Sequence, residues 1–442
     1  MQQTHPRRPF VQIPVLLTVE VPASGTIDDV EPMIVAAGQA AMRAAVQVVC
    51  REYERQVMSC PRCGSDALQS EGTDERRLRT SFGRVLLVLR RLRCEGCGDR
   101  FRPADTFVAT LGGVNITARL RAACVLAGSS WPYQTAALVL RTLCGAEVGA
   151  ESVRRLTNAA GQIAARDETT AAARLIAPPA GEIRAEREAA RREPRASAAA
   201  PAHLLVGLDG GWVPSRDQPG GMEGKVGVVA TEVEPVGRHG RHRLVRRRYV
   251  ATFGDGERVG LLTYAAAHAL DGDRAPHQTV LGDGAGWIKT QAALHFPEAT
   301  TILDWPHLVR AVHKAIRAAR PGAANTAVRR NAHQTILDLL WRGDVEGAIT
   351  ALVALPPPDA APIPAVVQTR TYLHEQRDWI GDYAAWRDAG EPIGSGMVER
   401  EVALVINRRM KRQGMRWRRA NADAVVALRV RSINQSWNQE AA

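Results

Sequence analysis

Residues 204–211 have the sequence Leu-Leu-Val-Gly-Leu-Asp-Gly-Gly, a short apolar run that ends in an acidic residue and two glycines. An apolar run of this length, bounded by turn-forming residues, predicts a buried β-strand over Leu204–Leu208. From here to about residue 310, strand patterns alternate with helix patterns. This alternation predicts an α/β domain of which Leu204–Leu208 is the first strand.

Four more strands are expected downstream, and a helix is expected at Leu261–Leu270. The first three strands follow one another directly, so they can form an antiparallel meander, whereas the last two are reached through helices and must be parallel. We therefore predict a mixed five-stranded sheet with helices on its faces. The additional strands are expected at Lys225–Val233, Arg246–Phe253, Thr279–Leu281 and Thr300–Leu303, with a polar turn at Gly237–Gly240.

Residues 59–108 carry two CxxC pairs, Cys60 with Cys63 and Cys94 with Cys97. Two strands, with a turn at Gly83, are expected between the pairs. Four thiolates brought together suit Zn²⁺ and leave it no open position, which predicts a structural zinc ribbon. The alternative is two chance pairs with free thiols. The remaining cysteines lack such spacing and are expected to be buried: Cys50, Cys124 and Cys144.

Residues 109–176 are expected to form a helical region. A short turn leads into the third helix, which begins with a serine and two arginines, Arg154 and Arg155. A turn followed by such a helix is typical of helix-turn-helix DNA readers, although any three-helix packing unit would look similar. The expected helices are Thr117–Ala127, Pro132–Cys144 and Glu151–Ala165.

Composition and periodicity divide the rest of the chain. Residues 1–58 are a mixed lead-in, with a strand-like run at Val11–Val19 and a helix at Met33–Arg55. Residues 177–202 contain prolines and a charged, alanine-rich run, which is typical of a linker. Residues 203–442 form the predicted core, interrupted by a mostly helical insertion at about 320–392 with a proline-rich break.

The chain has 442 residues and a formal net charge of +12, and arginine greatly outnumbers lysine. Such a charge predicts binding to a polyanion such as nucleic acid, although a basic enzyme from a high-GC genome would share it. The cysteines are too few for a disulfide framework. We expect no signal peptide, because the run Val11–Val19 is short and broken by Pro14, and no membrane span, because no apolar run reaches about 18 residues. The two CxxC pairs favour a reducing compartment, so we expect a cytoplasmic, nucleoid-associated protein.

Two aspartates follow predicted strands, Asp209 after the first and Asp283 after the fourth. If these strands are neighbours, their carboxyl ends are adjacent, which is where such sheets place ligands. Carboxylates suit Mg²⁺ or Mn²⁺, and two such ions could activate an attacking oxygen and stabilise a leaving one. Asp-Gly is also a common turn, and Asp255 and Asp273 have similar contexts, but Asp209 and Asp283 are preferred because an apolar strand directly precedes each of them.

Glu399 is a third candidate ligand, on a helix that runs into a basic cluster. On a helical wheel Glu399, Ile406 and Met410 share a stripe that is otherwise apolar, so Glu399 is expected to face protein. A buried carboxylate needs a partner, and a metal ion would serve. The alternative is a carboxylate that favours the helix N-terminus, capped by Ser395.

A basic cluster surrounds Trp417. We expect its cations to bind DNA phosphates and Trp417 to stack on an unpaired base. The alternative is a solvated basic helix with Trp417 in the core. The cluster comprises Arg408, Arg409, Lys411, Arg412, Arg416, Arg418 and Arg419.

Over residues 59–435 the chain resembles bacterial insertion-sequence transposases of the DDE type, most closely the Kra-type group related to Mutator-like transposases. The order of motifs carries this resemblance, together with a Cys-pair ribbon and a helical region ahead of the core. The motifs are Asp209-Gly210, Gly282-Asp283-Gly284 with Trp287-Ile288, Asp304-x-x-His307, Gly394-Ser395-Gly396-x-Val398-Glu399 and Gly414-Met415-Arg416-Trp417.

The resemblance implies an RNase H-like core with a helical insertion, in which Asp209, Asp283 and Glu399 bind two Mg²⁺ or Mn²⁺ ions. It places Asp304 and His307 near the active site, whereas His307 alone would be a helix-start residue packed by a tryptophan. The implied reaction is cleavage of DNA 3′ ends and strand transfer into double-stranded target DNA, by a homo-oligomer. The alternatives are a non-catalytic, zinc-dependent DNA-binding regulator and an RNase H-like nuclease.

Overall fold

The computed structural model describes residues 14–109, 115–176, 200–236, 241–322, 325–357, 361–394 and 396–434. The chain divides into two compact units, Met1–Thr157 and Asn158–Ala442. The division falls inside the long helix α5 (Ala150–Ile176), ahead of the expected boundary at residue 176. The predicted domain limits at 58, 108, 176 and 202 remain predictions, and the expected linker lies outside the described residues except for its last three.

The first unit contains a three-stranded antiparallel sheet of β1 (Leu68–Thr80), β2 (Gly83–Cys94) and the short β3 (Arg100–Phe101), in that order. The predicted turn at Gly83 is confirmed. Gly83 pairs with Thr80 and has a φ of 113°, a conformation that favours glycine. The first strand starts at Leu68 rather than near Leu78, so the ribbon's hairpin is longer than predicted.

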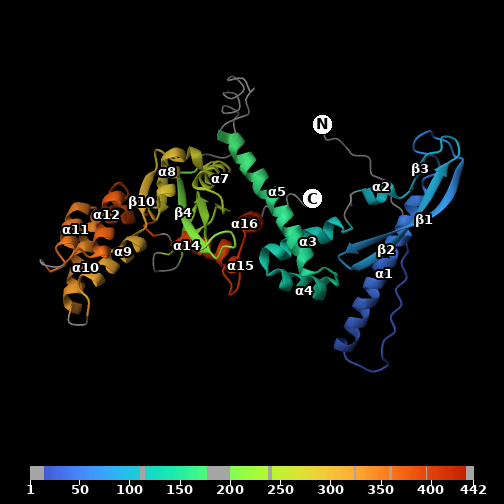
Figure 1. The fold of residues 1–442 in the computed structure, drawn as a ribbon, viewed down its shortest axis with the longest axis horizontal. Coiled ribbons are helices and arrows are strands. Elements are labelled where there is room, and N and C mark those ends of the chain that lie inside the picture. The colour runs from blue at the N-terminus through green and yellow to red at the C-terminus, as the bar shows by residue number, and fades with distance from the viewer. Residues whose placement is uncertain are drawn as a thin grey trace, which may run out of the picture. The chain divides into compact units, whose positions relative to one another are not determined.

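Helix α1 (Ile27–Arg55) runs alongside β2 (Figure 1). The side chain of Gln47 donates to the Val88 carbonyl at 3.1 Å and accepts from the Val88 amide at 2.9 Å. Glu54 accepts from the Arg90 amide at 2.7 Å. These contacts satisfy backbone groups of β2 that face no strand, which is one way in which proteins protect a sheet edge.

The exposed side of α1 is apolar. Its most apolar 18-residue window has a mean hydropathy of 1.5 and is only 6% buried, so α1 could cross a membrane by length and composition alone. One such helix near the N-terminus is weak evidence for a span. Polar residues such as Gln39 and Arg43 interrupt it, which is why no continuous apolar run is visible in the sequence. The expected strand at Val11–Val19 is absent from its described part, residues 14–19.

The predicted helical region contains α3 (Ala118–Ser130), α4 (Tyr133–Cys144) and α5, whereas the short α2 (Asp105–Val108) lies within the predicted ribbon segment. The three expected helices are confirmed, and α5 extends well beyond Ala165. Gly145, with a φ of 68°, ends α4 in the left-handed conformation. Cys50 and Cys124 are buried as expected. Cys144 is exposed, so that expectation was wrong, because this last residue of α4 lies outside the small core.

The second unit is built on a five-stranded mixed sheet with the order β10-β9-β4-β5-β8. Strands β4, β5 and β8 form the predicted antiparallel meander, and β9 and β10 are parallel to β4. This confirms the predicted sheet. A hairpin of β6 (Val233–Val236) and β7 (Arg241–Leu244) stands where only a turn was expected. The strands are β4 (His203–Val213), β5 (Met222–Ala230), β8 (Arg247–Thr252), β9 (His277–Gly282) and β10 (Thr300–Leu303).

Helices cover both faces of this sheet. One face of β4 packs on α7 (Gly256–His268), which contacts α8 (Gly286–His295). The insertion forms a helical group beside α9 (Trp305–Ala319), as Figure 1 shows, in keeping with the predicted helical segment. Its helices are α10 (Thr326–Trp341), α11 (Val345–Val353), α12 (Pro364–Gln376) and α13 (Tyr383–Asp388).

The opposite face is crossed by a helix with a π-helical turn in its middle, formed by α14 (Gly396–Glu401), η5 (Val402–Asn407) and α15 (Arg408–Met410). Helix α16 (Arg419–Ile433) completes the cover. A Cβ atom on Gly207 would lie 2.3 Å from Val398 Cγ2, and one on Gly211 would lie 2.7 Å from Val402 Cγ1. Glycines in β4 therefore allow the helix to approach the strand directly.

This close approach gives a stability prediction. Gly207→Ala should lower the free energy of unfolding by about 1–3 kcal/mol, because its methyl group would overlap Val398. Urea denaturation measures the change, and Val398→Ala in the same chain should restore part of the loss. Gly286→Ala, where a Cβ meets nothing within 4 Å, is the matched control. Equal effects of the two glycine substitutions would show that α14 does not seat on Gly207.

Candidate active site

The register of three parallel strands aligns three carboxylates. Leu208 of β4 pairs with Gly282 of β9, and Gly282 pairs with Leu303 of β10. The next residue along the chain is an aspartate in all three cases. Asp209, Asp283 and Asp304 therefore lie side by side at the carboxyl-terminal end of the parallel strands, which are about 4.8 Å apart. The prediction that Asp209 lies at the end of its strand was wrong, because β4 continues to pair with β5 as far as Val213.

Helix α14 brings Glu399 to the same end of the parallel strands. Side chains alternate along a strand, so Asp209 points to the face on which Gly207 and Gly211 receive the helix. Val398 sits over Gly207, and Glu399 follows it directly. The sheet and the crossing helix thus converge from segments far apart in the chain.

Glu399 is exposed, with 47% of its side chain accessible, so the prediction of a buried carboxylate was wrong. Ile406 and Met410 are buried. The π-helical segment Val402–Asn407 contains Ile406 and separates Met410 from Glu399. It has more residues per turn than an α-helix, so a wheel drawn for one continuous α-helix puts Glu399 on the wrong face. The expected cap, Ser395, lies outside the described residues.

The carboxylates act on one another electrostatically. Burial, followed by the negative charges of Asp283 and Glu399, raises the pKa of Asp209 to about 6, against an opposing hydrogen bond from the Gly210 amide. Burial is the largest cause of this shift, and the smaller repulsion by Asp283 and Glu399 indicates that the three carboxylates lie within electrostatic reach of one another. Among the described residues, the only group of three or more potential ligands close enough to hold a metal ion is the cysteine cluster, so these carboxylates do not form a closed cation site.

Asp304 and His307 form a coupled pair at the start of α9. Asp304 is fully buried, caps the helix by accepting from the His307 amide at 3.0 Å, and hydrogen-bonds His307 Nδ1. This side-chain hydrogen bond raises the pKa of His307, and the charges of Asp304 and Asp283 add to the effect. The imidazole is therefore oriented by its hydrogen bond to Asp304.

Sequence reasoning missed two side chains at this site. Arg310 of α9 lies 3.4 Å from Glu399 Oε1, and the Tyr372 hydroxyl donates to the Asp283 carbonyl at 3.2 Å. Arg310 could have been found, because it follows His307 by three residues and therefore shares its face of the helix. Tyr372 comes 89 residues after Asp283, on α12, and no local pattern points to it.

Only some side chains of the basic cluster are exposed to solvent. Arg409 is 1% exposed and stacks 4.9 Å from the centre of the Trp417 ring, and Trp417 is itself buried and donates to the Met410 carbonyl at 3.1 Å. The prediction that Trp417 stacks on a base and that Arg409 binds phosphate was therefore wrong, because Trp417 belongs to the core under α16 and Arg409 is buried against its ring. The exposed members are Arg408, Lys411, Arg412, Arg416, Arg418 and Arg419.

In the first unit, Arg154 and Arg155 lie at the start of α5 as expected. Arg154 is paired with Glu151 at 2.6 Å, and Arg155 lies 3.9 Å from the same carboxylate. Both side chains are substantially exposed, so their ion pairs are weak. A DNA phosphate could replace Glu151 as their partner, and their role in DNA binding stays a prediction.

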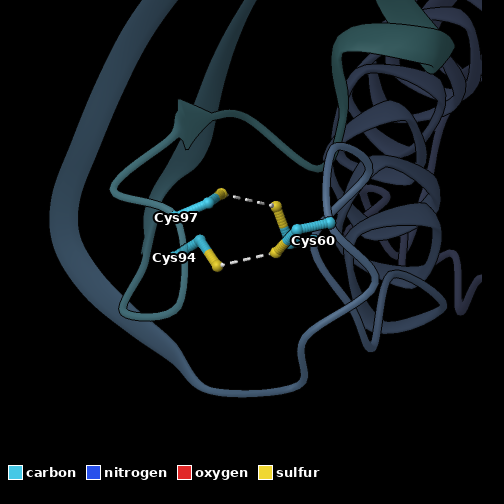
Figure 2. Close-up of side chains that lie close together, drawn as sticks. Cys60, Cys94 and Cys97 are labelled. Carbon is cyan, nitrogen blue, oxygen red and sulfur yellow. Dashed lines mark hydrogen bonds between the residues drawn. The ribbon is translucent and has the colours of Figure 1, made fainter.

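The four cysteines meet as predicted. Cys60 and Cys97 are 3.7 Å apart at sulfur, Cys63 and Cys94 are 3.5 Å apart, and all four sulfurs lie within 4.8 Å of one another. Figure 2 shows the side chains of Cys60, Cys94 and Cys97 directed into one small volume. Tetrahedral zinc thiolates with bonds of about 2.3 Å have sulfurs about 3.8 Å apart. The cluster could therefore bind zinc.

The two turns that present these thiols are alike. The Gly64 amide donates to the Cys60 carbonyl at 2.9 Å, and the Gly98 amide donates to the Cys94 carbonyl at 2.8 Å. Both glycines have a positive φ, 75° and 74°. Repetition of one knuckle on both sides of a hairpin is what brings four thiols into a single site.

The raised pKa of Asp209 gives a pH prediction. The folded chain holds this proton more tightly than the unfolded chain, so the stabilising contribution is complete below pH 3.8 and is lost as the pH rises through about 6. Without added divalent cations, Asp209→Asn should lose less stability than the unsubstituted protein between pH 4 and pH 6 in urea titrations. Parallel pH profiles for the two proteins would show that Asp209 has no such shift.

Comparison with known proteins adds little to this geometry. No protein-family model and no curated protein sequence matches the chain. Among solved structures, the Drosophila P element transposase strand transfer complex is a weak neighbour. It has 11% sequence identity and a TM-score of 0.19, over 62% of this chain and 80% of that one. This similarity is too low to establish a common fold, and the case for function rests on the site itself.

Proposed function

We propose that the protein is a metal-dependent DDE transposase with an RNase H-like core, which cleaves the 3′ ends of an insertion sequence and joins them to target DNA. The observation that supports this most strongly is the arrangement of Asp209, Asp283 and Glu399. Asp209 and Asp283 come from the adjacent strands β4 and β9, and Glu399 comes from helix α14, which packs on that sheet. Such a constellation suits phosphodiester chemistry at hard cations.

The donor set fits Mg²⁺ or Mn²⁺. Three carboxylates offer hard oxygen ligands, and the smaller part of the rise in the pKa of Asp209, which comes from Asp283 and Glu399, supports their lying within electrostatic reach of one another. The Arg310–Glu399 ion pair is long and exposed, so it compensates little of their charge. When bound, two such ions would activate the attacking oxygen and stabilise the leaving oxygen.

The neighbouring side chains suit a phosphate substrate. Asp304 holds Nδ1 of His307, which leaves Nε2 as the ring atom that can donate to a phosphate oxygen. The raised pKa of His307 favours its cationic form, which a bound phosphate would stabilise further. Arg310, released from Glu399, could bind the same phosphate through its guanidinium group.

The DNA partner is supported by charge. The net charge of +12 and the exposed cations that follow α14 favour double-stranded DNA beside the carboxylates. The zinc ribbon and the helices after it would recognise the element ends. Joining two ends at once implies a homo-oligomer.

The proposal is tested with purified protein, Mg²⁺ and linear DNA that carries the terminal repeats flanking the gene that encodes the protein. The expected result is 3′-end cleavage followed by covalent joining of the ends to a target plasmid, read on denaturing gels. Cleavage without joined product would favour the RNase H-like nuclease. Specific DNA binding with neither product would favour the non-catalytic, zinc-dependent regulator.

A further inference from the structure

One helix of the insertion contacts the loop that carries Asp283. This loop, residues 282–286, joins β9 to α8. The Tyr372 hydroxyl donates to the Asp283 carbonyl at 3.2 Å, and Gln376 Nε2 donates to the Gly284 carbonyl at 3.0 Å. Tyr372 and Gln376 are four residues apart in α12 and therefore share a face of that helix. A single helix face thus holds two successive carbonyls of the loop.

The two hydrogen bonds fix the backbone on which the Asp283 side chain depends. The pairing of β9 with β4 and β10 ends at Gly282, so the carbonyls of Asp283 and Gly284 lie beyond the ladder. A buried carbonyl without a partner is costly, so the donors from α12 stabilise this conformation of the loop. The Asp283 carboxylate accepts from the Ala285 amide at 2.9 Å, so its orientation follows the backbone of the same loop.

Close packing leaves the loop little freedom to move. Gly284 has a φ of 82°, and a Cβ atom there would lie 2.5 Å from Gln376 Oε1 and 2.9 Å from Leu303 Cδ1. The Gln376 side chain is buried. On the other side of the loop, Lys289 Nζ of α8 donates to the Glu375 carbonyl at 2.6 Å. The end of α12 therefore contacts both the loop and the helix that follows it.

The two donors to the loop carry no charge. A hydroxyl and an amide orient the backbone without neutralising the Asp283 carboxylate, whereas a lysine or an arginine would compete with a metal ion for it. Burial, followed by the negative charges of Asp283 and Asp304, raises the pKa of Tyr372. The Tyr372 hydroxyl therefore keeps its proton and remains a donor. Neutral donors of this kind suit the support of a carboxylate whose charge is needed for a cation.

We propose that Tyr372 and Gln376 are positioning residues that hold Asp283 in the orientation in which it binds a divalent cation. The helical insertion then sets the metal affinity of the site, although none of its side chains is a proposed ligand. The proposal rests on the proposed function, because that function makes Asp283 a metal ligand. Removal of a side chain that orients a metal ligand typically lowers metal affinity about 10- to 100-fold.

The test measures Mn²⁺ binding to the full, zinc-loaded chain by isothermal titration at pH 7. Tyr372→Phe removes only the hydroxyl, and Gln376→Met removes the amide but keeps a side chain of similar length. Each substitution should weaken Mn²⁺ binding about 10-fold or more, because the loop then no longer holds the Asp283 carboxylate in one orientation.

Tyr383→Phe is the matched control. The Tyr383 hydroxyl is another donor from the insertion to a strand-end carbonyl, that of Leu303, at 2.8 Å, and Tyr383 is fully buried. Its loss should lower the free energy of unfolding in urea at least as much as Tyr372→Phe does. Leu303 precedes Asp304, which is not one of the three proposed ligands, so the Mn²⁺ affinity should stay unchanged.

Unchanged Mn²⁺ affinity in Tyr372→Phe or in Gln376→Met would overturn the assignment of that residue. An equal loss of affinity in Tyr383→Phe would overturn both assignments, because it would show a general effect of lost stability. Since Mn²⁺ binding requires no DNA, the two proposals can fail separately. Strand transfer with unchanged Mn²⁺ affinity in both variants would refute only the positioning role. Weakened Mn²⁺ binding in the variants of a chain that joins no DNA ends would refute only the transposase.

Discussion

Asp283→Asn should lower the rate of DNA cleavage at least about a thousandfold while the protein still binds DNA. The substitution removes one negative charge from the site and keeps the shape of the side chain. The amide oxygen of the new side chain could still accept the hydrogen bond that the Ala285 amide now donates to Asp283 at 2.9 Å, so the loop after β9 should keep its conformation. The measurement is single-turnover cleavage in Mg²⁺, with circular dichroism to check folding.

The chain supplies a matched control. Asp273 has a similar glycine context but lies in a short 3-10 helix and hydrogen-bonds His268 at 3.0 Å, away from the aligned strand ends. Asp273→Asn should therefore leave cleavage unchanged. Full activity of Asp283→Asn, or an equal loss in both variants, would contradict the assignment of the site.

Cys94→Ser should release the zinc ion and unfold the ribbon. Structural zinc sites contribute about 10 kcal/mol or more to folding, and the hairpin of β1 and β2 has only a small core of its own. The substitution should lower the Tm of this unit by at least about 10 °C. Metal analysis of the purified protein should find one zinc per chain before the substitution and none after it.

Cys144→Ser is the control for this experiment, because Cys144 is a free cysteine outside the cluster. It should change neither the zinc content nor the Tm. If Cys94→Ser kept its zinc, or lost it without any fall in Tm, the cluster would not be a structural site.

The sheet was predictable because its strands are apolar runs bounded by turn residues, and because connection length decides parallel or antiparallel pairing. The hairpin of β6 and β7 was missed because each strand has only four residues, and β7 has arginine and histidine in place of an apolar pattern. The cluster of four cysteines was predictable from spacing alone. Two similar turns, one at each CxxC pair, bring the four thiols together.

The burial of individual side chains was harder to predict. Whether Glu399 or Trp417 faces solvent depends on the π-helical turn and on how α16 covers it, and neither has a local signal. Arg429 of α16 illustrates the point. Its guanidinium group donates to the carbonyls of Leu404 and Val405, 25 and 24 residues earlier in the chain, and so stabilises the π-helical turn.

The central claim is that Asp209, Asp283 and Glu399 together bind divalent cations. Isothermal titration of Mn²⁺ into the zinc-loaded protein at pH 7 tests it most directly, because Mn²⁺ prefers carboxylates to thiolates. We expect saturable binding that is lost in Asp209→Asn with Asp283→Asn and clearly weakened in Glu399→Gln. Unchanged Mn²⁺ binding in the double variant would contradict the account.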